Sequence, residues 1–344
     1  MTIGELVRND IFSRVSDESL STLEYVDANF WQPFYEKFHL GGKNLFDEYF
    51  FPYGLIQDAN LKKSAVYAEL RKRWGKKKGP EEVIKQLATP QDAFIDICTG
   101  SNLSGHPQKL ALAFKQLSDL GAPGAIRPFF MQLSLAVSEG SVPSSMAVKI
   151  TRVVEDFLVR RAVCGHEPTG LHAVFKRLWG DCKGTFTAAK VAAVIAGHKT
   201  VVWPDNDAFK KAICSRPLYG AGITKFVILQ YDKSLGGDDP SDTFYIEHIL
   251  PSALSSEWKK LFSTEAHSKM KDLLANLLPL SGTMNSSLGN QSFGKKKKRY
   301  SHGSMFVSAR QFAKSANSWT PKELSKRSNK LANWAVKRWP SSRG

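Results

Sequence analysis

Three groups of polar residues lie close together in the last third of the chain. Glu247 and His248 end a run of β-type residues, Asn276 follows an irregular stretch, and Asn285 comes nine positions later. A histidine titrates near pH ~6.5 and can accept the proton of a water at neutral pH. Carboxylate and amide oxygens are hard ligands that suit Mg²⁺ or Mn²⁺ better than zinc. These residue types are those that metal-assisted hydrolysis of a phosphodiester requires.

The residues of this group are expected to have different roles. Adjacent side chains on a strand point to opposite faces, so Glu247 and His248 cannot both bind one ion in a simple extended strand. We therefore expect Glu247 and Asn285 to bind the metal and His248 to act as the general base. Asn276 is expected to support His248, by holding its loop or by fixing the orientation of the imidazole. Each residue taken alone is more often structural, and it is their order and spacing that favours a site.

The elements around these residues are short. Residues 243–246 are typical of a strand that leads into Glu247. Residues 273–280 predict either the second strand of a hairpin or a short helix with a strand, and residues 283–290 open a helix. A strand, a hairpin return and a helix follow one another in ββα-metal nucleases, so that domain type is predicted here.

Several motifs in this region resemble the HNH nuclease half of the GmrSD-type defence nucleases. They are EHILP from Glu247, ANLLPL from Ala275 and NSSL from Asn285, followed by Phe293 and Lys296. The H-N-N order is also similar to the HNH domain of RNA-guided nucleases. Looser similarity covers residues 2–9, 157–161 and 203–205. Two departures are a Glu at 247, where Asp is commoner, and no second histidine at helical spacing after Asn285.

The resemblance implies a metal-dependent endonuclease that acts on phage or modified DNA, most simply as a nickase. It matches His248 to the general base, Glu247 and Asn285 to the metal ligands, and Asn276 to the supporting residue. It also matches Lys296 to a catalytic lysine that faces the scissile phosphate. The ParB-like N-terminal domain of the family is not recognised, so we expect sensing to reside in a separate domain or subunit. A C-terminal fragment and a short family member both stay open.

The remaining sequence predicts helices. Apolar residues recur at helical spacing over residues 3–12, 61–74, 108–120, 126–139, 144–163, 171–179 and 186–198, and again after Pro321. We therefore expect a mainly α protein in two parts. The first is an all-helical adaptor domain over residues 1–215, and the second is a ββα-metal (HNH) nuclease domain with basic C-terminal helices over residues 216–344.

The charge of the chain indicates which class of molecule it binds. The chain of 344 residues has 48 Lys and Arg against 32 Asp and Glu, a formal charge of +16. Fourteen of the basic residues and one acid, Glu323, fall after position 293. A positive field of this kind attracts nucleic acid. We expect Lys295, Lys296, Lys297, Lys298 and Arg299 to contact the DNA backbone, although a solvated helix face is the alternative.

Other sequence features exclude some classes of protein. No stretch of eighteen or more apolar residues and no signal-peptide pattern occurs, so we expect a cytoplasmic protein without a membrane segment. The four cysteines form no CxxC pair, which argues against a structural zinc site. Two other functions stay open: a DNA-binding or partner-binding module with an unused site, and an HNH ribonuclease.

Overall fold

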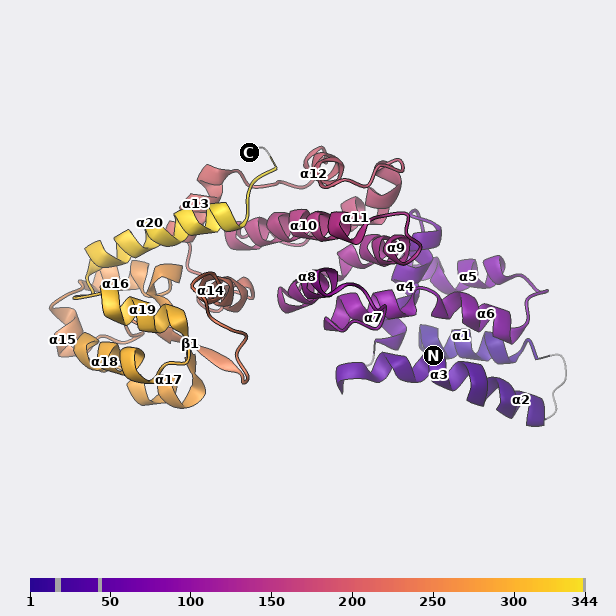
Figure 1. Cartoon of the computed structure of the whole chain (residues 1–344), viewed down its shortest axis with the longest axis horizontal. Coiled ribbons are helices and arrows are strands. Elements are labelled where there is room, and N and C mark those ends of the chain that lie inside the picture. The colour runs from indigo at the N-terminus through magenta and orange to yellow at the C-terminus, as the bar shows by residue number, and fades with distance from the viewer. Residues whose placement is uncertain (16–19, 43–44, 343–344) are drawn as a thin grey trace. The chain divides into compact units, whose positions relative to one another are not determined.

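The computed structural model describes residues 1–15, 20–42 and 45–342. This part of the chain is mainly helical, as expected, and its two strands form one antiparallel pair (Figure 1). The chain divides into two compact units. Unit 1 comprises Met1–Glu155 and Pro168–Val202, and unit 2 comprises Asp156–Glu167 and Trp203–Gly344. These bounds differ from the expected boundary after residue 215, and the division into an adaptor and a nuclease domain stays a prediction.

Unit 1 is built from helices and short helical turns. Its first helix begins with a capping box, in which the Thr2 hydroxyl accepts from the Glu5 N–H and the Glu5 carboxylate accepts from the Thr2 N–H. In its core the buried ring of Phe94 meets the rings of Phe38 and Tyr49 edge to face. The elements are α1 (Ile3–Phe12), α2 (Leu20–Val26), η1 (Asp27–Trp31), α3 (Gln32–Glu36), η2 (Lys37–Gly42), α4 (Phe46–Gln57), η3 (Lys63–Ala65), α5 (Val66–Trp74), α6 (Pro80–Ala88), α7 (Gln91–Thr99), α8 (Gln108–Asp119), η4 (Gly124–Ile126), α9 (Arg127–Ser138), α11 (Leu171–Asp181) and α12 (Ala188–Ala196).

Helix α10 (Ser144–Cys164) contributes residues to both units. The rest of unit 2 contains the expected strands and the candidate site. Its elements are α13 (Asn206–Ser215), α14 (Ile223–Ser234), β1 (Phe244–His248), α15 (Ser256–Lys259), α16 (Thr264–Met270), η5 (Leu274–Asn276), β2 (Leu277–Ser281), α17 (Gly282–Leu288), α18 (Phe293–Gly303), α19 (Val307–Ser315) and α20 (Pro321–Arg338).

The strand pair and the helix after it form the frame of the site. β1 pairs with β2 in an antiparallel register that sets Phe244 opposite Ser281 and His248 opposite Leu277. Pro279 is tolerated in β2 because each strand of a two-stranded sheet has a free edge. Helix α17 follows β2 without a break and packs against both strands, while α14 and α19 pack against β2. The order strand, strand, helix is therefore present.

The predicted helices differ from the observed ones in few places. The helix expected over residues 61–74 begins later, because Lys62 has extended backbone angles and η3 precedes α5. Residues 273–280 take the second of the two predicted forms, a short helical turn followed by a strand. Several helices were not predicted, among them α7, α16 and α19. Helix α13 was also not predicted, although Asp205 caps it by accepting from the Ala208 N–H.

No helix in the described part of the chain is both long and apolar enough to cross a membrane.

Candidate functional site

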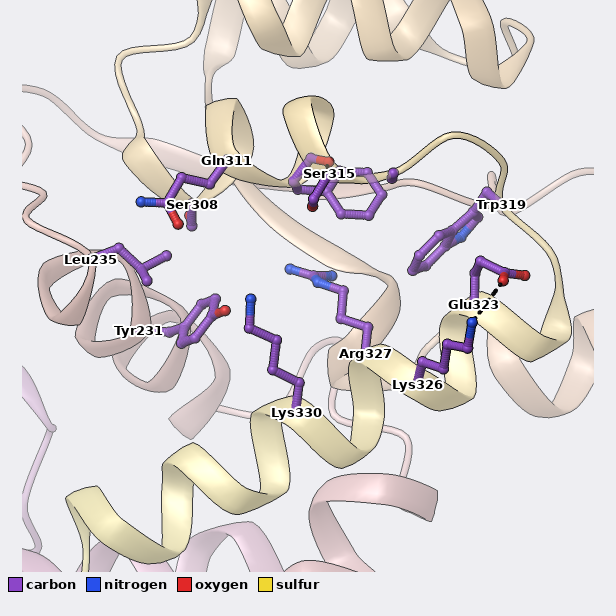
Figure 2. Close-up of a pocket in the computed structure, with 12 residues that line it drawn as sticks. Tyr231, Leu235, Ser308, Gln311, Ser315, Trp319, Glu323, Lys326, Arg327 and Lys330 are labelled. Atoms are coloured by element: carbon purple, nitrogen blue, oxygen red, sulfur yellow. Dashed lines mark hydrogen bonds and ion pairs between the residues drawn. The ribbon is translucent and has the colours of Figure 1, made fainter.

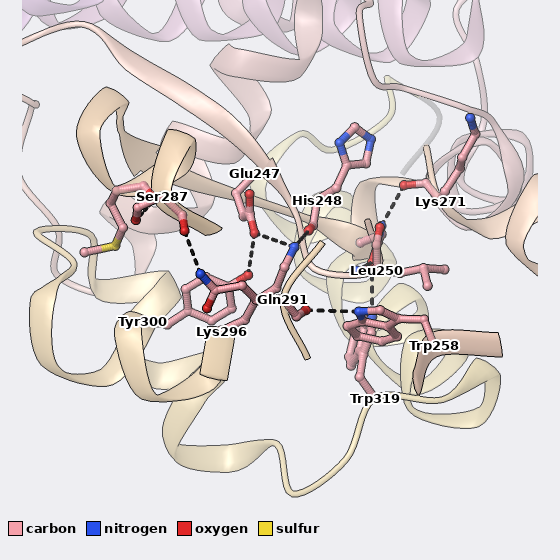
Figure 3. A network of polar contacts seen from close by, with 12 residues as sticks. Glu247, His248, Leu250, Trp258, Lys271, Ser287, Gln291, Lys296, Tyr300 and Trp319 are labelled. Carbon is pink, nitrogen blue, oxygen red and sulfur yellow. Dashed lines mark hydrogen bonds and ion pairs between the residues drawn. The ribbon is translucent and has the colours of Figure 1, made fainter. Parts of the chain in front are cut away.

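Glu247 and His248 occupy the last two positions of β1, and each has its own set of partners. Figure 3 shows the Glu247 carboxylate among the side chains of α18, and the His248 imidazole away from them. This separation follows from the alternation of side chains along a strand. The strand thus provides two chemically different positions next to each other.

The Glu247 carboxylate is buried and held by two residues of α18. Its Oε1 accepts hydrogen bonds from Lys296 Nζ at 2.8 Å and from the Tyr300 hydroxyl at 2.8 Å. Lys296 Nζ also donates to the backbone oxygen of His248 at 2.6 Å. Burial lowers the pKa of Lys296, and the charge of Glu247 opposes that effect. Neither contact uses Oε2, to which no described residue donates.

The surroundings of His248 favour the neutral form of its imidazole. Its Nε2 lies 3.0 Å from Asp272 Oδ1, and its ring lies 4.1 Å from the ring of Tyr219. Because a carboxylate only accepts, Nε2 carries the proton and Nδ1 keeps a lone pair that can accept one. Burial lowers the pKa of His248, and the hydrogen bond to Asp272 raises it in part. The imidazole is therefore neutral near pH 7, which is the state that a general base needs.

Asp272 and Tyr219 were not singled out from the sequence. The backbone oxygen of Asp272 accepts from the N–H groups of Leu218 at 2.8 Å and Tyr219 at 3.1 Å. Those two bonds join the segment before α14 to the segment before β2 and bring both side chains to His248. No spacing pattern could reveal this, because Asp272 lies 24 positions after His248 and two short helices, α15 and α16, lie between them. The joined segments supply the partner that fixes the imidazole.

Asn276 holds the chain that follows His248. Its Oδ1 accepts from the Leu250 N–H at 2.8 Å and from Trp319 Nε1 at 3.0 Å, and its Nδ2 donates to the backbone oxygens of Leu250 and Lys271. The side chain is fully buried with every donor and acceptor used. Of the two supporting roles expected, these contacts favour holding the loop, since Asp272 orients the imidazole.

Asn285 lies in α17, the helix that packs against β1. Its Oδ1 is buried and has no hydrogen-bond partner among residues 1–15, 20–42 and 45–342. A buried amide oxygen without a partner costs about 1–3 kcal/mol, so native structures usually satisfy it. This oxygen is therefore a candidate ligand for a group bound from outside the chain.

The consecutive basic residues near the start of α18 point to different sides of the helix, and some are exposed while others are buried. Lys295, Lys298 and Arg299 are exposed and Lys297 is half-buried. The DNA contact expected of Lys296 stays a prediction, and in the structure its side chain is 1% exposed and faces Glu247. Its spacing from Tyr300 places both on the inner face of the helix. In this position Lys296 contacts Glu247 and lies away from the exposed cations.

The chemistry of the oxygen donors on β1 and α17 is of the kind that hard divalent cations prefer. Over the described residues, no three His, Cys, Asp or Glu side chains come together in a metal-binding group. The free Oε2 of Glu247 and the unpartnered Oδ1 of Asn285 are both oxygen donors. Mg²⁺ usually takes one or two protein ligands and completes its octahedron with water and substrate phosphate. The residues therefore suit Mg²⁺ or Mn²⁺ and do not suit a closed zinc site.

The end of β1 thus carries a histidine and a buried carboxylate, and helix α18 carries exposed cations. Residues 203–334 match the family described as GmrSD restriction endonucleases, C-terminal domain. The similarity to this family covers less than half of the chain, and it indicates a nuclease of the restriction-endonuclease type in this segment. A search of curated proteins finds no match to the chain.

Proposed function

We propose that unit 2 is a metal-dependent nuclease domain of the HNH, or ββα-metal, type, and that it hydrolyses one strand of DNA at a time. The observation that carries the proposal is the unpartnered, buried Oδ1 of Asn285 on the helix packed against the strand of Glu247 and His248. The family match supports a role in antiphage defence or in restriction of modified DNA.

Each of these side chains has a separate role in the proposed hydrolysis. Nδ1 of His248 accepts the proton of the attacking water, while Asp272 stabilises the imidazolium that results. Asn276 keeps the chain after His248 in place. Glu247 and Asn285 would hold Mg²⁺ or Mn²⁺, which when bound neutralises charge on the phosphate and on the leaving oxygen. A single site of this kind cuts one strand, so a nick is the simplest product.

The expected adaptor domain and sensing partner remain part of the proposal. In this account the helices of unit 1 link the nuclease domain to a separate sensing domain or subunit. Recognition of a modification is assigned to that partner and not to the described residues.

Replacement of Asn285 by alanine tests the metal ligand. We expect metal affinity to fall by at least roughly 10–100-fold, the loss seen when residues that only support metal ligands are removed. In EDTA the variant should be as stable as wild type, because Oδ1 loses no hydrogen bond and alanine favours a helix. The measurement is the rise in thermal midpoint on adding Mn²⁺, together with plasmid nicking.

The matched control is Asn290→Ala, which removes an exposed amide close by. It should keep both the Mn²⁺-dependent rise and the nicking. If Asn285→Ala shows the same Mn²⁺-dependent rise as wild type, Asn285 is not a metal ligand.

The exposed cations of α18 are proposed to contact the DNA backbone. Each phosphate contact that is removed should lower the slope of log K against log salt by about 0.9. We therefore expect Lys298→Gln and Arg299→Gln each to weaken DNA binding and flatten its salt dependence, for any sequence of duplex. Fluorescence anisotropy at several salt concentrations measures this.

Lys199→Gln provides the comparison, since Lys199 is exposed in unit 1. Its slope should equal that of wild type. An unchanged slope in both α18 variants would show that the DNA path does not cross this helix.

A further inference from the structure

A pocket of about 280 Å³ lies in unit 2 among α14, α19, α20 and the chain before α20 (Figure 2). This volume is near the lower end of the range for small-molecule sites, roughly 300–1,000 Å³. None of the proposed catalytic or metal-binding residues lines it. The lining residues are Tyr231, Leu235, Ser308, Gln311, Phe312, Ser315, Ala316, Trp319, Glu323, Lys326, Arg327 and Lys330.

Two cations of the pocket, Arg327 and Lys330, have no carboxylate partner among the described residues. Arg327 donates only to backbone oxygens, those of Ala275 and Leu277, and no described carboxylate pairs with it. Burial lowers the pKa of Arg327 to about 10, so the group is desolvated and still charged at neutral pH. Lys330 extends into the same space beside Tyr231 and has no ion-pair partner in the described chain (Figure 2). An anion would compensate both cations.

The one acid in the lining is already engaged. Glu323 Oε1 lies 3.5 Å from Lys326 Nζ, and the Thr320 hydroxyl donates to Oε2 of Glu323. Figure 2 shows this ion pair at one end of the pocket, away from Lys330. Arg327 and Lys330 therefore determine the charge of the remaining space.

A second observation at the pocket also indicates a ligand. Ser308 is 3% exposed, and its Oγ has no hydrogen-bond partner within the described residues. Its backbone N–H donates to Asp232 Oδ1 at 2.6 Å, which leaves the hydroxyl facing the pocket. A hydroxyl both donates and accepts, so leaving it buried and unpaired is costly unless a bound group satisfies it.

We propose that this pocket binds an organic phosphate of about the size of a mononucleotide. Its phosphate lies between Arg327 and Lys330, because a guanidinium and an ammonium together match a doubly charged phosphate monoester. Ser308 Oγ hydrogen-bonds the ligand. The rings of Tyr231, Phe312 and Trp319 and the side chain of Leu235 form the apolar part of the wall and contact its organic portion.

Isothermal titration calorimetry of the full chain with adenosine monophosphate tests the proposal. Wild type should bind it, and Lys330→Gln should bind at least roughly tenfold more weakly, since it loses a hydrogen bond between two charged groups. Ser308→Ala should weaken binding without lowering the thermal midpoint, because the hydroxyl it removes has no partner. Lys337→Gln, the same charge change at an exposed position of α20 outside the pocket, should bind as wild type does.

Further titrations identify the source of the phosphate. Inorganic phosphate should bind more weakly than adenosine monophosphate, because it lacks the organic portion. The proposal is overturned if wild type does not bind the nucleotide, if Lys330→Gln binds it equally well, or if inorganic phosphate binds as tightly. It is also overturned if Lys330→Gln weakens binding only of a short duplex, which would make the pocket part of the DNA surface. His248→Ala should bind the nucleotide normally, so this test is independent of nuclease activity.

Discussion

Replacing His248 by alanine is expected to slow DNA nicking by roughly 10²–10⁴-fold, the usual contribution of a general base. The imidazole is the one neutral base at the end of β1, and its Nδ1 keeps a lone pair because Asp272 accepts the proton on Nε2. The initial rate of conversion of supercoiled plasmid to open circles measures the effect. DNA binding should be preserved, because His248 is not among the exposed cations of α18.

Two other variants separate a catalytic role from a general loss of structure. His302→Ala makes the same change at an exposed position of α18 and should nick at the wild-type rate. Asp272→Asn keeps an oxygen that can accept from Nε2 but removes the negative charge, so it should lose less activity than His248→Ala. Equal nicking by wild type and His248→Ala would rule out His248 as the base.

Lys296→Met is expected to destabilise unit 2 by about 3–5 kcal/mol, the usual cost of removing one partner from a buried ion pair. Glu247 is buried, and the substitution leaves its carboxylate with the Tyr300 hydroxyl as the one remaining hydrogen-bond donor among the described residues. It also removes the ammonium that binds the backbone oxygen of His248. Chemical denaturation measures the change in the free energy of unfolding.

Lys298→Met is the matched control, because Lys298 lies on the exposed face of the same helix. Its free energy of unfolding should stay within about 0.5 kcal/mol of wild type. Adding Glu247→Gln to Lys296→Met should recover part of the loss, since the unpaired charge is then gone. A Lys296→Met variant as stable as Lys298→Met would show that the pair does not support the site.

Part of this site follows from sequence patterns. The strand before Glu247, the Pro321 start of α20 and the helix that carries Asn285 are local features, and local propensity is enough to predict them. The role of Asn276 depends less on local sequence. Its type and position indicate a supporting residue, but its bonds to Leu250 and Trp319 depend on tertiary packing.

Other features could not be predicted, or were hidden by a stronger pattern. Asp272 meets His248 only because the chain after residue 248 folds back through α15 and α16. Lys296 lies within a run of four lysines that looks like one solvated face. Its helical spacing from Phe293 and Tyr300 was the available signal that it points inward. Which side of a basic helix is buried depends on what that helix packs against.

Unit 2 is proposed to cut DNA with a metal held by Glu247 and Asn285. This can be tested by incubating the wild-type protein with supercoiled plasmid in Mg²⁺ or Mn²⁺, and in parallel with EDTA. We expect open circles in the presence of the metal and intact supercoiled plasmid in EDTA. Plasmid that stays supercoiled with either metal, or that is nicked equally in EDTA, would show that the domain is not a metal-dependent DNA nuclease.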